Sequence, residues 1–266
     1  MKKILSFFIV PLFFFSSWPG LTTTLTKEQA TIIVGNGIDP QALNISEFNG
    51  ITLIGITPPE STKFDVTIVP AKRAINVIKQ ALALIEKNSP FSKSQIELLK
   101  MNGPVIIVYD PRYPKKEPTT SSVKIALFSP FYYSQKKKYK TRHTFLVIVS
   151  RHGAKWPIKE LAAVLVHELV GHGTQYLNGK WNKMRLVDME CEAWLYEEMA
   201  YQNLKMDKFS TVMINFKKQL EKQCESFLRY LKHSDSIGET EWNKLNPDVL
   251  KLLEHFAFYQ KQLKKQ

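Results

Sequence analysis

The spacing of apolar residues changes about halfway along the chain. In the first half, short runs rich in β-branched residues alternate with Gly, Asn, Asp and Pro, a pattern typical of strands and turns. We predict strands at residues 30–34, 51–56, 64–69, 105–109, 123–128 and 144–150. Apolar residues at helical spacing predict two helices between them, at 72–87 and at 92–101, the second with Ser92 as its N-cap.

From Pro157 onward the pattern becomes helical. Pro157 suits the first turn of a helix and Asn178 with Gly179 suits its end, which predicts a helix of about 20 residues. Further helices are predicted at 187–205, 208–232 and 248–262, with a break at 234–247. We therefore expect one α+β domain over residues 21–266, with a mixed sheet and helices first and a helical C-terminal half. The alternative is two lobes that divide near Arg151, with the site at their junction.

Residues 1–20 predict a secretory signal peptide. Lys2 and Lys3 precede an apolar run at residues 4–15, which is too short for an ordinary membrane span. The cleavage site is uncertain because Trp18 and Pro19 lie where small residues are usual. We expect an exported protein, periplasmic or secreted, and the alternative is an uncleaved anchor.

The formal net charge of +13 raises the question of an anionic partner. The lysines are scattered, with small clusters at 136–140 and 261–265, and no nucleic-acid-binding motif accompanies them. We therefore expect no nucleic acid partner and interpret the charge as solvated surface, with attraction to anionic surfaces as the alternative. The sequence does not indicate an oligomeric state.

The segment VLVHELVGHGTQY, residues 164–176, holds the candidate chemistry. His167, Glu168 and His172 lie within two helical turns and suit a zinc ion beside a general base. The common HExxH motif places its histidines four residues apart, whereas here they are five apart and about 140° out of register on a regular α-helix. A π-bulge would return both imidazoles to one face. Gly171, which has no Cβ, is the residue where such a bulge forms most easily.

HELVGH resembles the HExxGH motif of the dipeptidyl peptidase III family, which are gluzincin-like zinc metallopeptidases. In that family both histidines bind zinc, and the second glutamate of an EECRAE motif is the third ligand. The segment MECEA, residues 189–193, is similar to that motif around its cysteine, so the resemblance implies Glu190 as the ligand. Met189, Glu192 and Trp194 depart from it. Those enzymes are larger and cytosolic, so the resemblance implies the metal site and not the substrate.

Two alternatives stay open at this point. Glu192 competes with Glu190 as third ligand, because the pair Glu192-Ala193 resembles the third-ligand segment of other HExxH peptidases. The two glutamates point about 200° apart on a helix, so one of them at most faces the metal. Cys191 and Cys224 either form a disulfide, or Cys191 is a small buried hydrophobic residue.

These features predict a zinc-dependent metallopeptidase that hydrolyses peptide or protein substrates. Zn²⁺ would activate water, and Glu168 would be the general base. Candidates for stabilising the oxyanion are Tyr176, Tyr196, Tyr201, His152 and His233.

By analogy with HExxH peptidases, we expect the strand at 144–150 to be the sheet edge that pairs with extended substrate. Two other functions compete with peptide hydrolysis. One is a non-catalytic metal-containing binding protein of the same fold with a basic partner-binding surface. The other is a zinc hydrolase that acts on a non-peptide bond.

Overall fold

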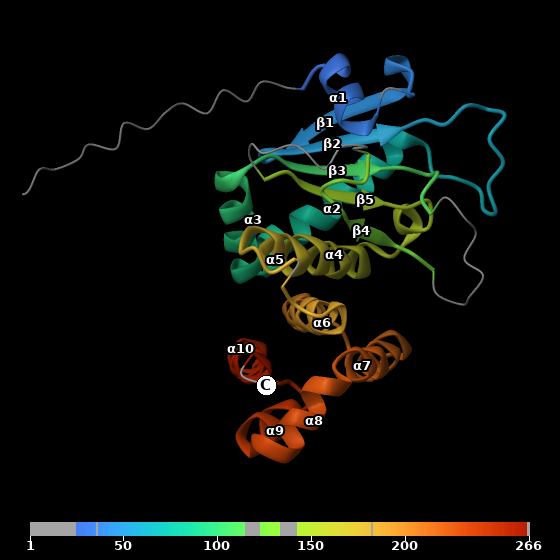
Figure 1. Cartoon of the computed structure of the whole chain (residues 1–266). Helices are drawn as coiled ribbons and strands as arrows, with labels where there is room; N and C mark the ends of the chain where they lie inside the picture. The colour runs from blue at the N-terminus through green and yellow to red at the C-terminus, as the bar shows by residue number, and fades with distance from the viewer. Residues whose placement is uncertain (1–24, 36, 115–122, 134–142, 182, 265–266) are drawn as a thin grey trace, which may run out of the picture.

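The computed structural model describes residues 25–35, 37–114, 123–133, 143–181 and 183–264. It confirms the α+β class, with a five-stranded mixed sheet in the N-terminal half and a mostly helical C-terminal half (Figure 1). The predicted signal peptide and the lysine cluster at 136–140 lie outside the described residues. None of the helices in the described part of the chain is both long and apolar enough to cross a membrane.

The sheet has the strand order β1-β2-β3-β5-β4. β1 (Leu43–Phe48) and β2 (Ile51–Ile56) form an antiparallel hairpin. Its turn residues Asn49 and Gly50 both have positive φ, as a two-residue hairpin turn requires. β3 (Val105–Tyr109) and β5 (Phe145–Val149) continue the sheet in parallel, and β4 (Ala126–Phe128) closes it antiparallel to β5. β3 and β5 are buried on both faces, which explains their continuous apolar sequences.

Helices cover the two faces of the sheet unequally. α2 (Ala71–Asn88), α3 (Pro90–Asn102) and α4 (Ile158–Val166) pack in the larger core on one face. α1 (Lys27–Val34) packs on the other face in a smaller core. The apolar stripe of α2 that the sequence predicts is buried against the sheet and α4. This packing holds α4 firmly beneath the sheet.

The C-terminal helices build outward from α4 (Figure 1). α6 (Leu186–Asn203) packs against α4, and its buried residues lie on several sides because further helices cover its far side. Those helices are α7 (Thr211–Gln223), α8 (Glu225–Ser234), α9 (Ser236–Trp242) and α10 (Val249–Leu263). α6 is therefore the central helix of this half.

Several predicted elements are wrong. Residues 30–34 belong to helix α1, because Thr26 and Gln29 form a capping box that outweighs the β-branched residues after it. Residues 64–69 form a loop that ends at Pro70, the N-cap of α2. The helix predicted at 208–232 is two helices that meet at Cys224, and the predicted break at 234–247 contains α9. Ser92 is buried inside α3, which follows the N-cap residue Ser89.

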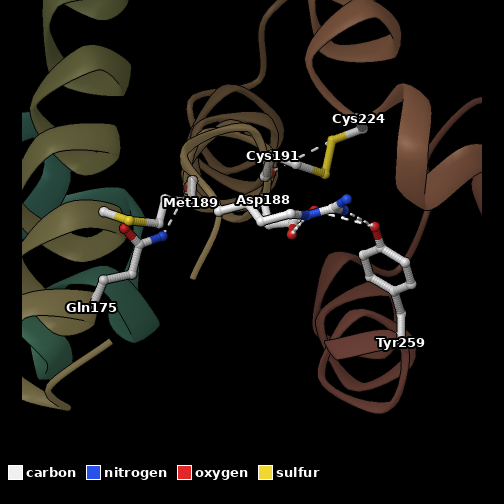
Figure 2. Close-up of a disulfide and its surroundings, with 7 residues drawn as sticks. Gln175, Asp188, Met189, Cys191, Cys224 and Tyr259 are labelled. Atoms are coloured by element: carbon white, nitrogen blue, oxygen red, sulfur yellow. Dashed lines mark hydrogen bonds and ion pairs between the residues drawn. A yellow bond between two sulfur atoms is a disulfide. The ribbon is translucent and has the colours of Figure 1, made fainter. Parts of the chain in front are cut away.

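A disulfide joins Cys191 of α6 to Cys224 between α7 and α8 (Figure 2). It resolves the alternative that the sequence left open for these two residues. Both cysteines are buried among the apolar side chains of the larger core. Such a bond persists in oxidising compartments.

Candidate metal centre

The helix that carries the motif is interrupted by one π-helical segment. α4 continues directly into the π-helix His167–Gly173 and then into α5 (Thr174–Leu177). The wider π turn brings the rings of His167 and His172 together, with centroids 4.9 Å apart. The predicted irregularity between the two histidines is confirmed.

Gly171 is glycine because it lies against the facing helix, whereas the sequence suggested that it eases the formation of a π-bulge. A Cβ at this position would lie 2.7 Å from the Cβ of Ala193 and 2.8 Å from its Cα. The π-helix and α6 therefore touch backbone to backbone at this point. The close approach brings the N-terminal half of α6, including Glu190, up to the two histidines.

His167, His172 and Glu190 form a group in which one potential ligand atom from each residue lies within 4.8 Å of the others. The two carboxylate oxygens of Glu190 are each 3.6 Å from the Nε2 atom of one histidine. Two ligands 2.0–2.2 Å from a tetrahedral zinc ion are about 3.4 Å apart, so these distances fit a zinc site. Glu190 and not Glu192 is the glutamate of α6 that lies with the histidines.

Behind His167 lies a second carboxylate, from Glu197. Its Oε2 is 3.0 Å from Nδ1 of His167. The two atoms do not form a hydrogen bond, because Oε2 lies off the direction in which the ring N–H points. Burial lowers the pKa of His167, but Glu190 and Glu197 outweigh burial and raise it to about 10. A carboxylate behind a ligating histidine fixes the ring and makes its free nitrogen a better metal ligand.

His172 has its own support. Its Nδ1 lies 3.0 Å from Oε1 of Gln175, so Nε2 faces Glu190. The amide of Gln175 in turn donates to the carbonyl of Met189 and to the carboxylate of Glu192 (Figure 2 shows the first of these). Glu192 also accepts from Lys180 at 2.7 Å. Glu192 therefore belongs to the layer that orients His172.

The N-terminal end of α6 is fixed from its far side. Arg185 binds Asp188 with two hydrogen bonds, and the hydroxyl of Tyr259 on α10 contacts both residues. Figure 2 shows Asp188 and Tyr259 facing each other. Asp188 and Cys191, the disulfide cysteine, lie on either side of Glu190 in the sequence. Glu190 thus lies on a turn of helix held to α10 and to the α7–α8 junction.

Glu168 is buried beside the histidines and is fixed by the sheet. Its Oε2 accepts a hydrogen bond of 2.6 Å from the backbone N–H of Phe128 in β4. From the sequence, the strand at 144–150 is expected to be the edge beside the motif. That expectation is wrong, because β5 pairs with β3 on one side and β4 on the other, and β4 is the edge strand.

A groove of about 700 Å³ runs past the candidate metal site. Residues 123–126, which include the start of β4, form one wall, α4 and α6 form the floor, and α7 forms the opposite wall. His167, Glu168 and Glu190 all face it. Hydrogen bonds donated by the N–H groups of Ser129 and Ser150 pair β4 with β5. Along an antiparallel strand, residues whose backbone groups face the partner strand alternate with residues whose backbone groups face away. The N–H and C=O of Ala126 therefore point away from β5.

The candidates for oxyanion stabilisation lie in different places. Tyr201 lines the groove close to Glu197. Tyr176 packs among aromatic rings that include Phe128 and Trp181.

Like Tyr176, the other three candidates lie outside the groove lining. Tyr196 stacks on Phe91, and burial raises the pKa of its hydroxyl. His233 is exposed in the last turn of α8. His152 lies 3.4 Å from Asp65.

The residues that support the two histidines were not predicted from the sequence. Glu197 follows Glu190 by seven residues, which places both on one face of α6. This spacing could have predicted that Glu197 lies near the metal ligands. Gln175 follows His172 by three residues, also on one face of a helix. Nothing in the sequence predicts the contact of Glu168 with β4, because this contact depends on the order of the strands in the sheet.

Comparisons with known proteins found no matching family model, no matching curated protein and no matching solved structure. The geometry of the site is therefore the basis for assigning a function.

Proposed function

We propose that this protein is an exported zinc-dependent metallopeptidase. The observation that carries the proposal is the convergence of His167, His172 and Glu190 beside one groove, which His167, Glu190 and the buried carboxylate of Glu168 line. Three protein ligands leave a coordination position open for water, which is typical of catalytic rather than structural zinc. The disulfide supports export, in agreement with the leader that the sequence predicts at residues 1–20.

The chemistry that bound zinc supplies is a water of lowered pKa and a polarised substrate carbonyl. His167, His172 and Glu190 would hold the ion, while Gln175 orients the imidazole of His172 and the charge of Glu197 lies 3.0 Å from Nδ1 of His167. Glu168 would take the proton of the attacking water and deliver it to the leaving amine. Its hydrogen bond to Phe128 N–H keeps one carboxylate oxygen fixed and leaves the other for the proton.

The groove wall at residues 123–126 supports an extended peptide as substrate. The outward N–H and C=O of Ala126 have the geometry to pair with a peptide backbone by strand addition. A peptide held there lies between β4 and α7 and passes His167 and Glu190. This arrangement favours peptide-bond hydrolysis over hydrolysis of other bonds, because backbone pairing selects polypeptide.

The replacement Glu168→Gln tests the proposal. The wild type is incubated with a peptide library in the presence of zinc, and cleavage is measured by mass spectrometry. We expect Glu168→Gln to bind zinc like the wild type and to lose hydrolysis by about 10²-fold or more. Glu254→Gln, an exposed change on α10, is the matched control and should cleave normally. A wild type that binds zinc and cleaves no peptide would instead be the non-catalytic metal-containing binding protein.

A further inference from the structure

The part of the groove beyond the metal site contains one more carboxylate. Glu160 and Val164 lie one helical turn apart on α4 and lead along the floor to His167 and Glu168, and Trp156 lines the groove just before the helix begins. Glu160 is half-buried, and burial raises the pKa of its carboxyl group. Lys124 and Lys222 also line the groove, but among the described residues no basic side chain forms an ion pair with Glu160. Glu160 is thus a groove carboxylate without an ion-pair partner in the part of the chain that the structure describes.

We propose that Glu160 selects substrates that carry a lysine or arginine side chain close to the scissile bond. This inference rests on the proposed function, because it assigns a specificity to the same groove. An ionised carboxylate in a partly apolar setting gains most from a cation that brings its own apolar stem. Val164 and Trp156 of the floor, with Phe216 of α7, surround the path with apolar surface for that stem.

The helix geometry sets where the basic residue must lie. Glu160 precedes His167 by seven residues, which is about 10.5 Å along the helix axis. An extended peptide advances about 3.4 Å per residue, so this length corresponds to about three residues. We therefore expect the basic side chain within about three residues of the scissile bond, and on one side of it only.

Glu160 also has a structural role in α4, which an experiment must distinguish from recognition of the substrate. It lies in the first turn of α4, where a carboxylate interacts favourably with the helix dipole. That interaction favours the ionised form and leaves the carboxylate oxygens open to the groove. If helix stability were its only role, Glu160→Gln would lower the melting temperature and leave peptide preference unchanged.

The first experiment measures binding without hydrolysis. The zinc-loaded Glu168→Gln protein is titrated with labelled peptides that are identical except for one position, which holds lysine, norleucine or glutamate. We expect the lysine peptide to bind about tenfold more tightly than the norleucine peptide, and the glutamate peptide to bind most weakly. Adding Glu160→Gln should reduce the lysine preference to about twofold or less. Equal binding of the three peptides would overturn the proposal whether or not the protein is a peptidase.

The second experiment measures cleavage of a peptide library by otherwise wild-type protein. Glu160→Lys should convert the basic preference into an acidic one at the same position. Glu254→Lys makes the same change of net charge on α10, outside the groove lining, and should keep the wild-type profile. An unchanged profile in Glu160→Lys would refute the role of Glu160. Selective binding without any cleavage would keep that role and remove the proposed hydrolysis.

Discussion

Replacing Gly171 with alanine changes the contact that brings the two ligand-bearing helices together. The new Cβ would lie 2.7 Å from the Cβ of Ala193 and 2.8 Å from its Cα. Carbon atoms in contact prefer about 3.5–4.0 Å, so α6 and the π-helix must separate by about 1 Å. The obstruction is partly backbone, and a change of rotamer in a side chain therefore cannot relieve it.

The expected effect is large on zinc binding and small on folding. Metal–ligand distances tolerate errors of about 0.2 Å, so a 1 Å displacement of Glu190 removes it as an effective ligand. We expect the zinc affinity of Gly171→Ala to fall by about 100-fold. Overpacking costs about 1–3 kcal/mol, and alanine recovers about 1 kcal/mol of helix propensity relative to glycine. The metal-free protein should thus lose at most about 2 kcal/mol of stability.

Zinc affinity is measured by competition with a chromophoric chelator, and the stability of the metal-free protein by urea unfolding. Gly173→Ala is the matched control, because it lies in the same π-helix and its Cβ would meet the end of the Leu99 side chain at 2.9 Å. Leu99 is able to change rotamer, so this variant should bind zinc nearly normally. Wild-type zinc affinity in Gly171→Ala would refute the argument that close helix contact assembles the site.

Three further predictions concern the residues around the site. Glu190→Ala should lower zinc affinity by more than 100-fold in a chelator competition, while Glu192→Ala should lower it by about tenfold, and the reverse order would exchange their roles. Glu197→Gln should weaken zinc binding by about 10–100-fold in the same assay without unfolding the protein, and an unchanged affinity would contradict its supporting role. Replacing Cys191 and Cys224 with serine opens a disulfide with a sequence separation of 33 and should lower the free energy of unfolding by roughly 3–4 kcal/mol. Urea unfolding checks this value, and a loss below about 1 kcal/mol would contradict it.

The sequence predicted the local features of the site well. The choice of Glu190 over Glu192 was implied by the family resemblance, whereas the helix from Pro157 to Asn178 and its irregularity after His167 follow from spacing along the chain. Such features are set within a few turns of one helix. The sequence therefore contains them as periodicity and as turn residues.

The features that the sequence did not predict depend on contacts between distant segments. The sequences of β4 and β5 both predict apolar strands. The order of the strands in the sheet decides which of the two is the edge strand. β1 was not predicted, although the apolar–polar alternation at its start is itself a strand signal. The groove wall formed by α7 depends on how that helix packs beyond α6, where the disulfide holds its C-terminal end.

The zinc content of the purified full-length protein is the most direct test of the candidate metal centre. The protein is equilibrated with zinc, passed through a desalting column and measured by elemental analysis, beside a variant with both His167→Ala and His172→Ala. We expect about one zinc ion per wild-type chain and less than about 0.1 per chain of the variant. A wild type without stoichiometric zinc, or a variant that retains it, would contradict the assignment of His167, His172 and Glu190 as the metal site.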